Sequence, residues 1–230
     1  MTTPQTQSQA GVRPAPEVAA SLISQSFGWM FAGLLLTAGL AALVSTNQNV
    51  IDNARGFWLP LVFGQLGLAI LIQGAIRRLS ASLALGLFFV FAATMGLTVG
   101  VIVSLYTIPS VVTAFFSAAA MFGAAALYGY TTKRSLTGLG GYLFMGMIGV
   151  LVASFVNLVL GSNPLGWAIS LVGVVVFTVY TAYDVQRIAY GTYVTLTGSV
   201  EKASVLGAVH LYINFVNLFL FLLRLMGGRR

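Results

Sequence analysis

The sequence has no cysteine among its 230 residues, which excludes disulfides, thiolate metal ligands and cysteine nucleophiles. It has a single histidine, His210, and few acidic residues, which are scattered along the chain: Glu17, Asp52, Asp184 and Glu201. A resident metal site needs several such side chains at helical spacing. No Gly-x-Ser-x-Gly element accompanies the histidine. We therefore expect no metal centre, no serine protease and, more broadly, no enzyme.

Charged residues are also scarce, at 7% of the chain, whereas a soluble domain has roughly a quarter. Hydrophobic residues make up 58% of the chain. They come in runs of about 20, the length that spans a bilayer as a helix. The sequence therefore predicts an all-α, polytopic membrane protein, embedded in the lipid bilayer.

Basic residues outnumber acidic ones by 11 to 4, giving a formal charge of +7. Most of them lie in short loops between the apolar runs, so lipid headgroups and membrane topology explain them better than nucleic acid does. Both lysines, Lys133 and Lys202, fall in such loops. A retinal protein needs a lysine within its last span, so a photoreceptor is not expected either.

The apolar runs predict seven transmembrane helices. Residues 1–22 have no apolar core, so we expect a disordered cytosolic tail rather than a signal peptide, followed by a membrane domain over 23–230. The predicted spans are 23–44, 57–76, 81–106, 111–128, 141–160, 165–190 and 203–225.

The basic residues between the spans are divided six to one between the two sides of the membrane. The positive-inside rule then places the N-terminus in the cytoplasm. The basic C-terminus falls outside, against this trend. A re-entrant last run would keep it inside, but that run is long enough to span the bilayer, and we prefer seven full spans.

Glycines within the spans predict close helix packing, at Gly96, Gly100, Gly123, Gly146 and Gly149. This packing is expected within a monomer, and a weak homo-oligomer is the alternative.

Polar side chains gather in the last two spans, where they are costly in hydrocarbon and tend to mark pathways. Asp184 lies near the end of the sixth span, and His210, Asn214 and Asn217 share one face of the seventh. Asp184 is interpreted either as a titrating gate and transient calcium contact, or as an acid paired with Arg187. The alternatives are hydrogen bonds that join the helices for Asn214 and Asn217, and a core imidazole for His210.

Because a lipid-facing polar face would be unfavourable, we predict that the seventh span is the most enclosed. Asp184 and His210 fall at similar depths, so we also expect them to lie close enough to interact. Tyr212 is interpreted as an interface anchor.

Several segments resemble the Bax inhibitor family, in order along the chain. They are FFVFAATMGLTVGVIVSLYTIPSVVTAFFSAAAMFG, GAAALYGYTTKRSLT, TAYDVQ and HLYINFVNLFLFLLRLMG. The likeness extends from Phe27 onward and is greatest to the bacterial inner-membrane branch. It implies a seven-helix bundle with the last helix central. It also implies a pH-sensitive calcium leak in some members, and control of a membrane AAA protease or of cell death in others.

In the leak members, two aspartates on the last two spans share a proton and gate the path. Asp184 matches the first, but the second falls on Asn214. The acid of the second span falls on Gln65, and Arg77 lies one step from the position of their latch arginine. An Asp–Asn pair lacks the competition of two carboxylates for one proton.

Two functions follow as expectations. The first is a pH-modulated leak for calcium or another cation, with an altered gate at Asp184 and Asn214. The second is an interaction protein that modulates a partner such as a membrane protease and does not conduct ions. No cofactor is expected, other than calcium as the permeant ion.

Overall fold

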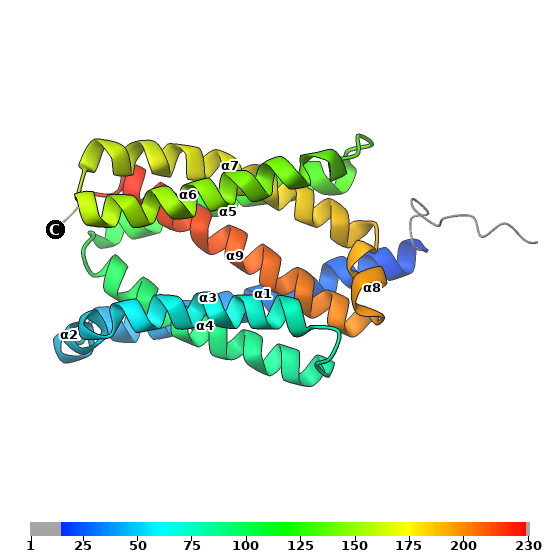
Figure 1. Ribbon diagram of the computed structural model, residues 1–230, viewed down its shortest axis with the longest axis horizontal. Coiled ribbons are helices and arrows are strands. Elements are labelled where there is room, and N and C mark those ends of the chain that lie inside the picture. Colours follow the sequence, from blue (N-terminus) through cyan, green and yellow to red (C-terminus); the bar gives the residue numbers. More distant parts are fainter. Residues whose placement is uncertain (1–14, 229–230) are drawn as a thin grey trace, which may run out of the picture.

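The structure, a computed structural model, describes residues 15–228, apart from the side chains of residues 54 and 55. Over this range the chain is entirely helical outside its loops (Figure 1). The elements are α1 (Pro16–Ser45), α2 (Gln48–Gly56), α3 (Trp58–Ala75), α4 (Ala81–Val103), α5 (Ile108–Thr131), the 3₁₀ turn η1 (Thr137–Leu139), α6 (Gly140–Leu160), α7 (Asn163–Ala189), α8 (Thr192–Thr197) and α9 (Val200–Met226).

Local chemistry sets several of the helix ends. Ser80, Ser162 and Ser199 cap α4, α7 and α9, because each side chain accepts a hydrogen bond from the backbone N–H three residues later. A proline stands in the first turn of α1, α5 and α7, where its missing N–H costs nothing. Gly161 ends α6 in a left-handed conformation, with φ of 62°.

Seven of these helices are long and apolar enough to cross a membrane, which confirms the predicted number of spans. The first span begins at Pro16 rather than at residue 23, so the predicted disordered tail is wrong for residues 16–22. Pro16 and Glu17 favour a helix start there. Residues 1–14 of the predicted tail lie outside the described residues. The short helices α2 and α8 lie in connections between the predicted spans, where the sequence predicts no helix.

The last helix, α9, lies at the centre of the bundle. It packs against α1, α4, α5, α7 and α8, and it crosses obliquely between α6 and α7 on one side and α1, α3 and α4 on the other (Figure 1). Within its most apolar window 72% of the residues are buried, against at most 44% for any other spanning helix. The prediction that the seventh span is the most enclosed is therefore confirmed.

Tyr212 fixes α9 against α1 and α4. Its hydroxyl is hydrogen-bonded to Thr37 Oγ1, which donates in turn to the carbonyl oxygen of Ala92 at 2.8 Å. The rings of Phe88 and Phe91 meet the Tyr212 ring edge-on. Tyr212 is completely buried, so its interpretation as an interface anchor is wrong.

The predicted glycine contacts are confirmed on α4 but not everywhere. Gly96 and Gly100 lie against Thr37, Leu40, Ala41 and Val44 of α1, where a Cβ atom would overlap its neighbours. Gly146 of α6 lies against Val176 of α7, as predicted, whereas Gly123 and Gly149 face open space, so their predicted packing within the monomer is wrong. The alternative, a contact in a homo-oligomer, stays a prediction. The sequence alone does not distinguish a glycine that allows two helices to approach closely from one that faces outward.

Gly129 of α5 lies against the backbone of α7, where an added Cβ would overlap the main chain of Ala182. Because backbone cannot move aside as a side chain can, we expect Gly129→Ala to destabilise the fold by about 1–3 kcal/mol. Gly123→Ala is the matched control on the same helix. It should leave stability unchanged or raise it by about 1 kcal/mol through helix propensity. Thermal unfolding of the purified variants measures both, and equal melting temperatures would contradict the packing described here.

Candidate functional site

Asp184 lies on the buried face of α7, in register with Thr181, Val185 and Ile188. This i, i+3, i+4, i+7 pattern makes one stripe of the helix, and α7 packs along α9 on the same side. Only 1% of the Asp184 side chain is exposed. A carboxylate in such a place needs partners, because an isolated buried charge is strongly unfavourable.

Three side chains supply these partners. The Tyr193 hydroxyl donates to Asp184 Oδ1 at 2.8 Å, and the Asn214 amide Nδ2 donates to Oδ2, also at 2.8 Å. The His210 Nδ1 atom lies 3.6 Å from the same Oδ2. Both carboxylate oxygens thus accept hydrogen bonds, which suits an ionised carboxylate. The site joins α7, α8 and α9, and the predicted proximity of Asp184 to His210 is confirmed.

Aromatic contacts enclose this centre on the side of α8. The ring of Tyr193 stacks on the ring of His210, with centroids 5.3 Å apart. The Arg187 guanidinium lies 4.6 Å from the centre of the Tyr193 ring and 5.3 Å from that of Tyr183. Arg187 was considered as the ion-pair partner of Asp184, but within residues 15–228 no salt bridge joins them. The acid pairs with His210 instead.

Burial and the nearby Asp184 carboxylate raise the pKa of Tyr193 well above its ordinary value. Its phenol therefore stays protonated throughout the physiological range. Neutral Tyr193 contributes stability that is fully present below about pH 10 and is lost only in more alkaline solution. The hydroxyl is accordingly a permanent hydrogen-bond donor to Asp184.

Two predicted site residues, Asn217 and Arg77, do not contact Asp184 within residues 15–228. The Asn217 amide donates to the Ile213 carbonyl of its own helix at 2.8 Å. Arg77 Nε donates to the carbonyl oxygen of Leu196 in α8 at 2.6 Å. Neither contacts Asp184 in the described chain, and their assignment to an ion path stays a prediction.

Gln65, at the position of the family's second-span acid, is also remote from Asp184. It is buried between α3 and α4, where its amide donates to Thr98 Oγ1 at 2.8 Å. It lines a cavity of about 400 Å³ between these two helices, together with Gly64, Gly67 and Thr94. This amide stabilises a helix pair rather than the centre at Asp184.

Tyr193 is the site residue that the sequence did not reveal. It lies nine positions after Asp184 in a segment expected to be a loop. No periodicity marks it, because α8 is too short to show a helical repeat. The only available signal was an aromatic residue in a polar connection between two polar helix ends.

One lengthwise face of α9 remains partly exposed although the helix is central. Its members between the two ends of the bundle are His210, Ile213, Asn217, Leu220, Phe221 and Arg224. Apart from the neighbours Leu220 and Phe221, they follow one another at three- and four-residue steps, so they form a single stripe. Asn214, in contrast, points to the buried side. The stripe begins beside Asp184 and ends at Arg224, which lies against Gly166 of α7.

The acidic and histidine side chains of residues 15–228 form no group of three that could hold a metal ion.

Known proteins resemble this chain over almost its whole length. Residues 19–230 match the family described as Inhibitor of apoptosis-promoting Bax1. The chain belongs to the Bax inhibitor family. It is 44% identical over 214 residues to the inner membrane protein YbhL of Escherichia coli strain K12, which covers 90% of this chain and 92% of that protein.

Relatives of lower identity come from other bacteria. An uncharacterized protein of Deinococcus radiodurans is 37% identical over 210 residues, or 91% of each chain. An uncharacterized membrane protein of Streptococcus pyogenes serotype M3 is 34% identical over 215 residues, or 89% of this chain and 93% of that protein. The resemblance stated from the sequence is thereby confirmed for the family.

Proposed function

We propose that this Bax inhibitor family protein is a cation leak for calcium or a similar ion, closed in the conformation described above. The observation that carries the proposal is the completely buried Asp184, bonded to α8 and α9 and placed beside the one histidine of the chain. Buried ionisable groups of spanning helices mark functional sites by default. The three-helix junction around Asp184 is the gate.

The partly exposed stripe of α9 supplies the route. It starts at His210 next to the gate and continues past Asn217 towards the other end of the bundle. Polar groups along it replace part of the hydration of a passing ion. Opening requires the bonds between Asp184 and its partners to break, since no surface of the carboxylate is accessible otherwise.

His210 sets the pH response in this proposal. The titratable and charged groups around it are Asp184, Tyr180, Tyr183 and Arg187 on α7, and Tyr193 on α8. Phenols and guanidinium groups ordinarily keep one protonation state between about pH 5 and 8, whereas imidazoles titrate near about 6.5. Protonated His210 forms an ion pair with Asp184 and holds α7 to α9. The leak therefore closes as the pH falls.

Calcium flux through purified protein in liposomes tests this function. Flux should fall severalfold as the pH is lowered from about 8 to 5, and His210→Gln should abolish that dependence. Because the chain has one histidine, any histidine-dependent response belongs to His210. Absence of calcium flux at every pH would refute conduction. If the pH dependence of the flux were unchanged in His210→Gln, His210 would have only a packing role.

One observation favours a second candidate, an interaction protein that modulates a partner such as a membrane AAA protease. Asp184 has a full set of partners, and Asn214 stands where the second carboxylate of the leak members is expected. A folded protein that shows no calcium flux in the liposome assay would support this role.

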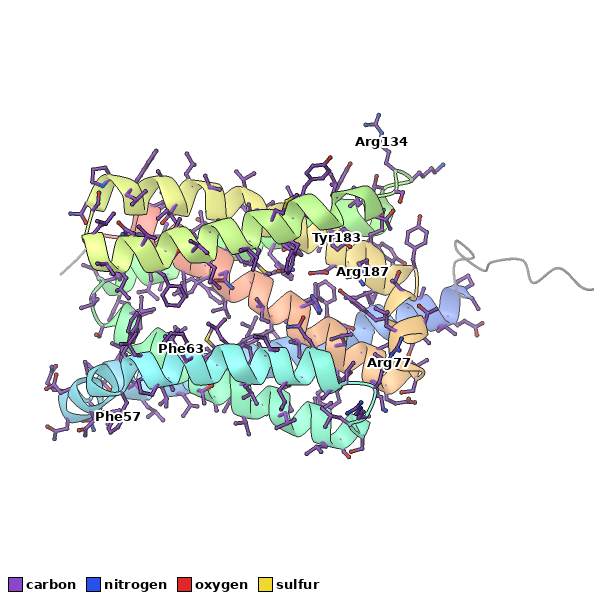
Figure 2. All side chains as sticks on the ribbon, viewed as in Figure 1. Phe57, Phe63, Arg77, Arg134, Tyr183 and Arg187 are labelled. Atoms are coloured by element: carbon purple, nitrogen blue, oxygen red, sulfur yellow. The ribbon has the colours of Figure 1, made fainter. Side chains whose placement is uncertain are left out.

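We also propose an inner-membrane location with the N-terminus in the cytoplasm. The relative from Escherichia coli is named an inner membrane protein. The basic residues Arg77, Arg134 and Arg187 lie towards one end of the bundle, opposite Phe57 (Figure 2), as the positive-inside rule requires.

Reporter fusions after Arg134 should report the cytoplasm, and fusions after Asn163 the outside. The reverse pattern would invert the orientation.

A further inference from the structure

Helix α8 is bounded on both sides by glycines in the left-handed conformation. Gly191 has φ of 67° and Gly198 has φ of 79°, values that other residues adopt only with strain. Between them lie only the six residues Thr192–Thr197, less than two turns of helix. A helix this short is only marginally stable by itself, so with a permissive residue at each end it can unwind as it swings away from the bundle.

The inner face of α8 covers the acid. Tyr193 is 2% exposed, and its hydroxyl reaches Asp184 Oδ1 while its ring lies on His210. Thr197 Oγ1 donates to the Tyr193 carbonyl at 2.8 Å, which keeps α8 wound as one turn. The Asp184 carboxylate cannot meet solvent from this side while Tyr193 is in place.

The outer end of α8 is fastened to the bundle by the turn that follows α3. Arg77 Nε donates to the Leu196 carbonyl at 2.6 Å, and Lys202 Nζ donates to the Arg77 carbonyl at 3.1 Å. Hydrogen bonds from charged donors are stronger than those between neutral groups. The turn after α3 therefore holds α8 down, although Arg77 does not touch Asp184 in the described structure.

We propose that α8 is a hinged lid over Asp184, that Tyr193 is its gate residue, and that Arg77 is the positioning residue that keeps the lid closed. The use of the lid to control ion passage depends on the proposed leak function. The opening of the lid does not depend on the leak function, because α8 can move whether or not ions pass.

Hydrogen–deuterium exchange of the full-length protein tests the lid directly. The amides of Val194, Thr195 and Gly198 donate to carbonyls within or beside α8, so their exchange reports its opening. Tyr193→Phe removes the bond to Asp184 and keeps the ring. Exchange of these three amides should then become about tenfold faster, the factor expected for one lost hydrogen bond to a charged group. The amides of α9 should be unaffected.

Arg77→Ala should also speed exchange in α8, whereas Arg78→Ala is the matched control. Arg78 carries the same charge one residue later, and its side chain has no bond to α8 in the described residues. Unchanged exchange of α8 in both Tyr193→Phe and Arg77→Ala would overturn the lid, as would equal acceleration in Arg78→Ala or in all helices together. Faster exchange without calcium flux would refute the leak and leave the lid standing. Calcium flux without any change in the exchange of α8 would refute the lid and leave the leak standing.

Discussion

Replacing Asn214 with aspartate should raise calcium flux at pH 8 by about tenfold and make its fall with pH steeper. At present the amide of Asn214 donates to Asp184 Oδ2 at 2.8 Å. A carboxylate there brings two like charges into contact in a buried site, and one of them must take up a proton or move away. Near pH 8 repulsion separates α7 from α9. At acidic pH a shared proton joins the two carboxylates.

The matched control is Asn217→Asp, which makes the same chemical change three residues further along α9. Asn217 bonds only to its own helix and stands on the partly exposed stripe, away from Asp184. The control should conduct like the wild type at pH 8, within about twofold, with an unaltered pH profile. If both variants responded alike, the charge of the stripe rather than the Asp184–Asn214 pair would govern the gate.

Much of this architecture follows from the sequence because the bilayer imposes simple rules. Apolar runs of about 20 residues had to be spanning helices, and the span that carries Asn214 had to be the most enclosed one. The similar depths of Asp184 and His210 in consecutive antiparallel spans made their proximity predictable, and they lie 3.6 Å apart. In each case the pattern extends over a whole helix, so it survives small errors at the ends.

Features that depend on one short segment or one neighbour could not be predicted in this way. The six residues of α8 carry no periodic signal, so neither the helix nor Tyr193 was found. Gly123 has the same local sequence character as Gly129, but only Gly129 faces another backbone. Asn217 satisfies itself on its own helix, and the sequence alone does not show which amide turns towards the acid.

Loss of the charge on Asp184 should have the largest effect of all. Asp184 is the one buried acid of the described chain, since Glu17, Asp52 and Glu201 are all exposed. Asp184→Asn keeps the shape and still allows neutral hydrogen bonds to Tyr193 and Asn214. It removes the attraction for a divalent cation and for protonated His210. We expect calcium flux at pH 8 to fall by about tenfold or more, and the remaining flux to be independent of pH.

The most direct test of the account is therefore calcium flux at pH 8 in liposomes that contain equal amounts of wild type, Asp184→Asn or Glu201→Gln. Glu201→Gln removes an exposed acid in the first turn of α9 and should conduct like the wild type. We predict that calcium flux through wild type and through Glu201→Gln exceeds that through Asp184→Asn by about tenfold or more. Equal flux through wild type and Asp184→Asn, or wild-type flux no greater than that of protein-free liposomes, would contradict it.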